Sequence, residues 1–220
     1  MRKTITTVLA LGLVVGALLA PAAEAKKKKK PVATTLYLHA TEQADEVNAF
    51  TGDAFNIMDS TAPTATSPSS MFVTNYVVGP NTACSGNQLV PTWQGNLAGT
   101  VKGNLTVKLH TVATPAAQLN IELFADGTGG CNSDLGSTGY VPPVSAQVVD
   151  VPAGQGTVEA KFSGLNFKTV GNLTVMVTMA PGVSGVLADP VQVRLLYDST
   201  DYPAAVTFGC LPAKGKSCTF

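Results

Sequence analysis

The sequence predicts an all-β fold: a two-sheet antiparallel β-sandwich of the jelly-roll type, with about ten strands and two disulfides. Three observations support this class. Apolar and polar residues alternate with period two in many short segments, turn-forming residues separate most of these segments, and evidence for helices is thin. With 45% hydrophobic and 13% charged residues among 220, the composition excludes a collagen-like or a charge-rich disordered chain.

The alternating segments can be placed in order along the chain. In residues 104–110, Leu105, Val107 and Leu109 alternate with polar residues, which predicts a strand with one buried face. Further strands are predicted at 34–39, 71–78, 88–94, 119–123, 146–151, 158–162, 173–179, 191–195 and 205–208. A short helix or turn is expected at 41–50, and an exposed extended loop at 61–70, which is rich in Thr, Ser and Pro.

A short internal repeat accompanies two of these segments. Gly-Asn-Leu-Thr-Val occurs at 103–107 and again at 171–175, and each copy is followed by a second alternating segment and an aspartate, Asp126 or Asp198. Duplicated hairpins would fit a two-sheet sandwich, and convergent strand chemistry would explain the five identical residues equally well.

The N-terminal residues predict export. Arg2 and Lys3 precede an apolar stretch at 5–20, and Ala-Glu-Ala at 23–25 matches a small-x-small cleavage pattern. We therefore expect a signal peptide at 1–25, a basic disordered arm at 26–32, one β-sandwich domain at 33–220, and a secreted, extracellular protein without a membrane span after cleavage. Since the five lysines at 26–30 oppose translocation of that end, an uncleaved anchor with a cytoplasmic body is the alternative.

Charge divides the chain into two unlike parts. Residues 31–220 carry seven basic and 13 acidic side chains, a net charge of −6, behind the +5 arm. A body of that sign repels phosphates, so nucleic-acid binding is not expected. The arm is expected to be a solvated tail, with electrostatic tethering to anionic wall polymers or phospholipid as the alternative.

The four cysteines, without a CxxC motif, predict two structural disulfides in an exported protein. Three pairings exist, and we favour Cys84 with Cys131 and Cys210 with Cys218. The last two enclose seven residues and can close a local loop. Cys84 and Cys131 each lie in a turn-rich stretch and would join two loops.

Motifs for catalysis are mostly missing. The chain has no His-Glu-x-x-His and no Gly-x-Ser-x-Gly, and Gly215-Lys216-Ser217 lacks the first glycine and the helix of a phosphate loop. The two histidines, His39 and His110, could join a triad or a metal site only through partners distant in sequence. We interpret His39 as a strand-end residue and His110 as a residue on a solvent face, and no catalytic residue or cofactor is assigned.

Loop acids and aromatics supply the remaining candidates. Asp126 with Asp134, and Asp198 with Asp201, could hold a structural calcium ion, although Asp126 and Asp198 are expected to cap turns instead. Trp93, Tyr140 and Tyr202 are candidates for sugar binding, because planar aromatics beside Pro or Gly suit a loop pocket. For Trp93 we favour a place in the core, since large aromatics are mostly buried.

Several segments together carry a resemblance. Thr-Leu-Tyr-Leu-His at 35–39, the Gly-Asn-Leu-Thr-Val strand, and Leu-Leu-Tyr-Asp-Ser-Thr-Asp-Tyr-Pro at 195–203 resemble secreted actinobacterial β-sandwich proteins of mostly unassigned function. The expected sandwich also resembles the galactose-binding-like jelly rolls that accompany extracellular hydrolases. These patterns are structural and transfer no binding residue to this sequence.

Three functions remain open on this basis. The favoured one is a secreted non-catalytic module that binds a carbohydrate, a wall polymer or a protein at the cell surface, with cell-wall or extracellular polysaccharide as partner. A structural coat protein is the second. The third is an extracellular hydrolase whose site is assembled from scattered acids or from His39 and His110.

Overall fold

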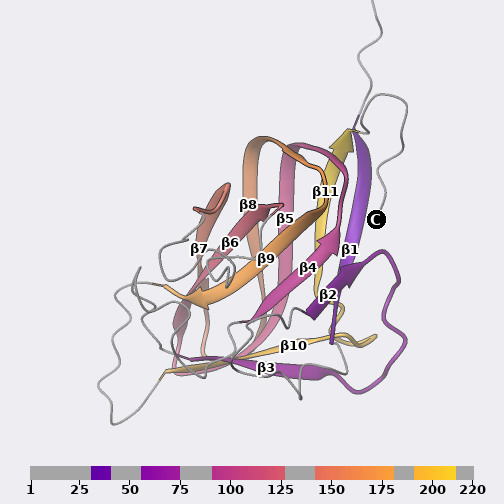
Figure 1. Cartoon of the computed structure of the whole chain (residues 1–220). Coiled ribbons are helices and arrows are strands. Elements are labelled where there is room, and N and C mark those ends of the chain that lie inside the picture. Colours follow the sequence, from indigo (N-terminus) through magenta and orange to yellow (C-terminus); the bar gives the residue numbers. More distant parts are fainter. Residues whose placement is uncertain (1–30, 41–55, 75–90, 127–141, 181–190, 212–220) are drawn as a thin grey trace, which may run out of the picture.

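The structure is a computed structural model that describes residues 31–40, 56–74, 91–126, 142–180 and 191–211. Every regular element within these ranges is a β-strand, so the predicted all-β class is confirmed (Figure 1). The strands are β1 (Val32–His39), β2 (Asn56–Asp59), β3 (Ser69–Thr74), β4 (Thr92–Asn96), β5 (Gly99–Thr114), β6 (Ala117–Ala125), β7 (Ser145–Val151), β8 (Gly154–Thr169), β9 (Asn172–Met179), β10 (Gln192–Tyr197) and β11 (Ala205–Leu211). The described residues include no helix of the length and hydropathy needed to cross a bilayer.

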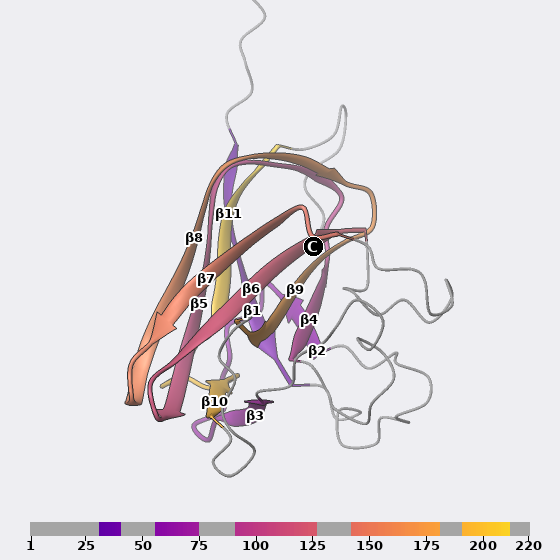
Figure 2. The ribbon, with the colours of Figure 1, turned by 90° about the vertical axis from the view of Figure 1, so that its left-hand side faces the viewer.

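Hydrogen bonds join all eleven described strands into one sheet. Its order is β3, β10, β5, β11, β1, β2, β4, β9, β6 and β7, and β8 pairs with the remaining edge of β5. Only β2 and β4 run parallel among the described pairs. The sheet curls so that β4, β9 and β6 form a layer opposite β8, β5 and β11 (Figures 1 and 2). The two predicted layers are therefore present, but they are continuous through β1 and β2.

Each of the ten predicted segments contains or overlaps an observed strand. The four-residue β2 is additional, because it is too short to show a clear alternation. Residues 60–68 form the expected exposed connection before β3 begins at Ser69. The expected helix at 41–50 and the parts of two predicted strands at 75–78 and 88–90 lie outside the described residues.

The longest strands, β5 and β8, exceed their predicted lengths because they pair with each other almost throughout. Their register runs from Gly99 opposite Thr169 to Ala113 opposite Gly154. It shifts once, where β8 carries one extra residue beside Gly164, whose φ of +67° lies in the left-handed region that glycine tolerates. Before this bulge the odd-numbered side chains of β8 point outward, and after it the even-numbered side chains do.

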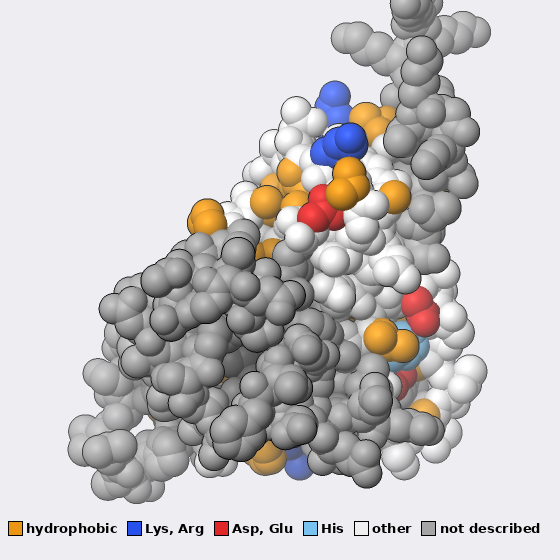
Figure 3. All heavy atoms as spheres, viewed as in Figure 1, with side chains coloured by type: hydrophobic (Ala, Val, Ile, Leu, Met, Phe, Trp, Pro, Cys, Tyr) orange, Lys and Arg blue, Asp and Glu red, His pale blue; other side chains and the backbone are white. Residues whose placement is uncertain are grey.

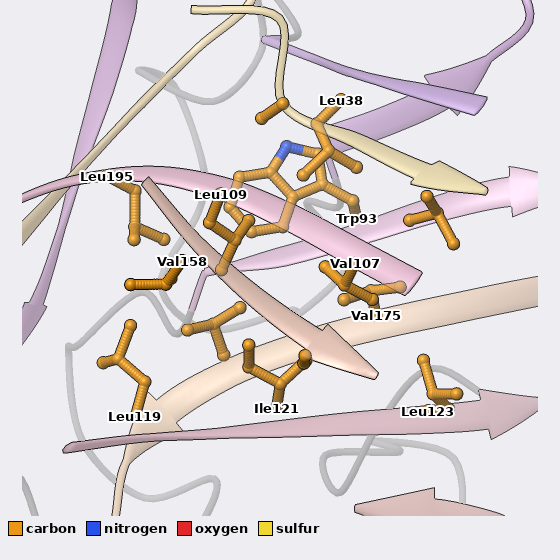
Figure 4. Close-up of a cluster of buried hydrophobic side chains, with 14 of the residues drawn as sticks. Leu38, Trp93, Val107, Leu109, Leu119, Ile121, Leu123, Val158, Val175 and Leu195 are labelled. Carbon is orange, nitrogen blue, oxygen red and sulfur yellow. The ribbon is translucent and has the colours of Figure 1, made fainter. Parts of the chain in front are cut away.

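The core fills the space between the two layers. Leu119, Ile121 and Leu123 of β6 point toward Val107 and Leu109 of β5 (Figure 4), and all five side chains are buried. These are the apolar members of the alternating segments, so the period-two pattern correctly identifies the inward face.

One glycine marks a close approach of strands. A Cβ added to Gly95 in β4 would lie 2.8 Å from the carbonyl oxygen of Met58 in β2 and 3.3 Å from Leu36 Cδ1 in β1. The parallel β2–β4 pairing leaves no space there for a methyl group.

We therefore expect Gly95→Ala to lower the free energy of unfolding by about 1–2 kcal/mol, measured by urea denaturation, because backbone must shift to admit the methyl group. Gly156→Ala is the matched control, since its added Cβ would meet only Pro152 Cγ, at 3.6 Å. Equal stability of the two variants would contradict this account of the β2–β4 contact.

Of the four cysteines, the described residues include Cys210, which is buried in β11. Cys84, Cys131 and Cys218 lie outside them, so both disulfide pairings stay predictions, as do the boundaries of the leader, arm and domain.

Candidate functional site

A histidine held between two carboxylates stands out among the polar contacts. His39 Nδ1 lies 2.6 Å from Asp198 Oδ1, whereas Nε2 lies 3.0 Å from the carbonyl oxygen of Thr61 and 3.3 Å from Asp59 Oδ1. We call His39, Asp59, Thr61 and Asp198 the His39 cluster. The side chains of His39 and Asp59 are 13% and 43% exposed, so the cluster reaches the surface at Asp59. In Figure 3, histidine atoms lie at the surface beside acidic side chains.

Strand ends bring this cluster together. His39 is the last residue of β1, where Leu36 and Leu38 point inward and its own ring points outward. Asp198 directly follows β10 with a φ of +58°, a left-handed conformation that aspartate tolerates better than most residues. Its second oxygen accepts a hydrogen bond from the Ala40 amide at 2.9 Å. One carboxylate thus fixes both the ring and the backbone at the end of β1.

Asp59 is held at the opposite side of the ring. Its Oδ1 accepts a hydrogen bond from the Thr61 amide at 2.7 Å. Partial burial alone would raise the pKa of Asp59, but hydrogen bonds from Thr61 and the nearby His39 outweigh it, so the pKa lies below its ordinary value. Asp59 is therefore ionised at neutral pH.

The partners of the ring are all hydrogen-bond acceptors. Nδ1 faces a carboxylate and Nε2 faces a carbonyl and a second carboxylate, all of which accept hydrogen bonds. Both nitrogens can donate only in the imidazolium form. When the ring loses a proton from Nε2, Nδ1–H can stay on Asp198 and Nε2 becomes a base. The cluster is thus chemically capable of storing and transferring a proton.

The second histidine lies in a different setting. His110, on β5, is buried beneath Tyr202, with ring centroids 5.5 Å apart, and its Nδ1 lies 3.1 Å from Thr157 Oγ1. Burial, and secondarily the charge of Lys108, lower the pKa of His110 below its ordinary value. Its Nε2 has no partner among the described residues. His110 points outward as the sequence suggests, but Tyr202 covers it and separates it from solvent.

Asp126 has a structural role. Its Oδ1 accepts hydrogen bonds from the amides of Val170, Gly171 and Asn172 at 2.8, 2.7 and 3.1 Å, and its Oδ2 accepts from Val170 at 2.9 Å. The carboxylate therefore caps the turn between β8 and β9, as expected. Asp198 caps the end of β1, where its Oδ2 accepts a hydrogen bond from the Ala40 amide.

The candidate calcium ligands do not gather in the described residues. The oxygens of Asp126 and Asp198 are used by backbone amides and His39, and Asp201 lies exposed in the connection between β10 and β11. No group of three His, Cys, Asp or Glu side chains in the described part is placed to hold a metal ion. Asp134 lies outside the described residues.

The three candidate sugar-binding aromatics are also dispersed. Trp93 is fully buried in the core, as the sequence interpretation favoured, and cannot contact a ligand in this arrangement. Tyr202 is half-buried, with its hydroxyl 2.8 Å from Gln155 Nε2. Tyr140 lies outside the described residues. Sequence reasoning missed the pairing of His39 with Asp198 and Asp59, because these residues meet only through the order of strands in the sheet.

Comparison with solved structures shows similarity of fold. A CocE/NonD family hydrolase from Staphylococcus aureus has 13% sequence identity and a TM-score of 0.52, covering 83% of this chain and 37% of its own. An α-amino acid ester hydrolase has 12% identity and a TM-score of 0.49, covering 81% and 36%. A CBM4 structure has 8% identity and a TM-score of 0.30, covering 51% and 60%. No family model and no curated protein matches the chain.

These similarities correct the favoured functional prediction. The interpretation as a non-catalytic binding module, and with it the prediction that the chain is not an enzyme, is contradicted, because the structure with a TM-score of 0.52 is that of a hydrolase. The hydrolase alternative agrees better with this finding. The CBM4 similarity is too low to support an argument for a galactose-binding-like relationship, and none of the similarities indicates an actinobacterial origin. Because the identity is 13% and the chain spans about a third of the hydrolase, the likeness establishes the fold alone.

Proposed function

We propose that the protein acts as a hydrolase and that the His39 cluster is its acid–base centre. The observation that carries the proposal is the 2.6 Å contact between His39 Nδ1 and Asp198 Oδ1, which fixes the ring and leaves Nε2 as the nitrogen that exchanges its proton. The fold shared with a CocE/NonD family hydrolase supports the reaction class.

The proposed chemistry uses the two nitrogens differently. Nδ1–H stays on Asp198, which stabilises the positive charge of the ring whenever Nε2 takes up a proton. Neutral Nε2 accepts a proton from water while the water oxygen bonds to an acyl carbon. The bond from that carbon to the leaving group then breaks, and the imidazolium returns its proton to the leaving group. Water is the only co-reactant in this sequence.

The contacts of Nε2 are all with hydrogen-bond acceptors. The Thr61 carbonyl oxygen lies 3.0 Å away and Asp59 Oδ1 lies 3.3 Å away. Nε2 must turn from these oxygens to a water molecule before it can accept a proton from that water.

We expect His39→Gln to lower kcat/KM for p-nitrophenyl acyl esters by at least roughly 100-fold, because glutamine cannot take up the proton. His110→Gln is the matched control and should retain activity within about twofold. Asp198→Asn provides a second test, since it keeps the shape but weakens the charge stabilisation. Thermal unfolding followed by circular dichroism verifies that each variant is folded. Absence of ester hydrolysis by the folded wild type, or full activity of His39→Gln, would overturn the proposal.

We also propose that this hydrolysis takes place outside the cytoplasm. The basic n-region, the apolar stretch at 5–20 and the Ala-Glu-Ala sequence support export through cleavage after Ala25. N-terminal sequencing of protein recovered from the culture medium tests this, and a chain retaining Met1 in the cell fraction would contradict it.

A further inference from the structure

The basic residues of the body are concentrated on one strand pair. Of the seven Lys and Arg residues in 31–220, four lie on β5 and β8: Lys102, Lys108, Lys161 and Lys168. Lys108 is half-buried, and the other three lysines are exposed. These four lysines define what we call the basic face. It contrasts with a body whose net charge is −6.

The Gly164 bulge brings the lysines to the same side. Lys161 and Lys168 are seven residues apart, so in a regular strand they would point to opposite faces. The extra residue at the bulge reverses the alternation, and both lysines are exposed while Phe162 and Leu165 on either side of Gly164 are buried. Thus the left-handed glycine places Lys168 on the outer face of the layer, which looks to the left in Figure 2.

The register between β5 and β8 places the four lysines in two pairs. Lys108 is opposite Glu159, and Lys161 is opposite Thr106, so Lys108 and Lys161 are diagonal neighbours. Lys168 is opposite Thr100 and is likewise diagonal to Lys102. Diagonal neighbours lie about 7–8 Å apart. From Lys102 to Lys108 the strand rises by about 20 Å. Two separated pairs suit an extended ligand with repeated negative charges better than one small anion.

One acidic side chain lies on the outer side of this strand pair. Glu159 Oε2 is 3.1 Å from Lys161 Nζ, and both side chains are largely exposed, so solvent screens their interaction. Asp126, in the adjoining part of the fold, also interacts with Lys168. Four lysines against these two carboxylates leave a net positive surface. It attracts polyanions at ionic strengths near or below the physiological value.

The surface beside the two lysine pairs is polar and uncharged. Thr35, Thr207 and Thr106 are aligned across β1, β11 and β5, and Thr35 Oγ1 lies 3.4 Å from Thr207 Oγ1. Exposed Asn104 and Asn166 add amide groups. Such groups match the hydroxyls of sugars. None of the exposed large apolar residues of the described part belongs to β5 or β8, which disfavours insertion into a lipid bilayer.

We propose that the basic face binds an acidic polysaccharide, with carboxylate or sulfate groups on the two lysine pairs and sugar hydroxyls on the Thr and Asn side chains beside them. This surface function goes beyond the proposed hydrolysis and does not depend on it, because no residue of the His39 cluster belongs to the basic face.

The test measures binding of the full chain to polygalacturonate at low and at moderate salt, with neutral amylose as the comparison polymer. We expect binding to polygalacturonate that weakens with added salt, and none to amylose. The double substitutions Lys102→Gln with Lys168→Gln, and Lys108→Gln with Lys161→Gln, should each weaken binding at least roughly fivefold. Arg194→Glu on β10 is the matched control, because it changes the net charge by the same two units outside the basic face, and it should retain affinity within about twofold.

Three further measurements make the outcome decisive. A variant with Gln in place of Lys26 to Lys30 separates the basic face from the arm, and loss of binding in this variant with full binding by both double variants would overturn the proposal. Tighter binding to phosphatidylglycerol vesicles or to an oligothymidylate than to polygalacturonate would also overturn it. Failure of wild-type binding to polygalacturonate would do the same. Ester hydrolysis, measured on the same samples, reports separately on the His39 cluster.

Discussion

Trp93→Ala should lower the free energy of unfolding by about 3–5 kcal/mol, the largest stability loss we expect from one substitution in this protein. The indole is fully buried in β4, and its ring lies edge-on to Tyr197, with centroids 5.1 Å apart. Figure 4 shows it next to Leu38 and Leu109, where the two layers meet. Alanine would leave a cavity that strands fixed by their hydrogen bonds could only partly close.

Urea denaturation followed by circular dichroism measures this loss, since the chain has no other tryptophan to report by fluorescence. Trp93→Phe is the informative control. It keeps an aromatic ring and removes an indole N–H that is buried without a partner among the described residues. Its free energy of unfolding should therefore fall clearly less than that of Trp93→Ala. A Trp93→Ala protein as stable as the wild type would show that the two layers do not pack around this residue.

Asp126→Ala should lower the free energy of unfolding by about 2–3 kcal/mol at neutral pH, because three backbone amides at the start of β9 lose a charged acceptor. Asp150→Ala is the control, because that exposed carboxylate accepts one hydrogen bond from Gln118 Nε2 and should cost at most about 0.5 kcal/mol. Chemical denaturation of both variants at pH 7 gives the comparison. Equal losses would indicate that water replaces the carboxylate of Asp126 without penalty.

The same carboxylate should make stability depend on pH. Burial alone would raise the pKa of Asp126, but hydrogen bonds from Gly171, Val170 and Asn172 outweigh it, so the folded-state pKa is below the ordinary value. A lowered pKa contributes stability above the unfolded-state pKa, and this contribution disappears as pH falls through the folded-state value. The difference between wild type and Asp126→Ala should therefore be full above about pH 5 and shrink in acid. A constant difference down to about pH 2 would contradict the role of the ionised form.

The strands are predicted well because the alternation of buried and exposed side chains can be read within each strand alone. Alternation at Leu105, Val107 and Leu109 reflects one face of one strand, and that information is contained in neighbouring residues. The continuous curled sheet was not predictable in the same way. It depends on β2, whose four residues pair in opposite senses with β1 and β4, and no local pattern encodes such a choice.

The candidate site was less accessible to sequence reasoning. His39 and Asp198 are separated by 159 positions, and they meet because β1 and β10 end at the same side of the sheet. The repeat did supply one usable signal. Asp126 and Asp198 follow corresponding segments, and both adopt a left-handed φ, of 53° and 58°, and bind the backbone of another strand. Recognising them as caps was possible, but the histidine partner of Asp198 was not evident from the repeat.

The central position of β1 has a consequence for biogenesis. β1 is the first described strand to be synthesised, yet one of its two neighbours is β11, and Thr35 meets Thr207 from 172 positions later in the chain. Contacts of such sequence separation form slowly, since a long loop must close before they can stabilise anything. The sheet therefore cannot be completed while the ribosome still holds β11, the last described strand. The described sheet would be complete only after β11 has left the ribosome and paired with β1.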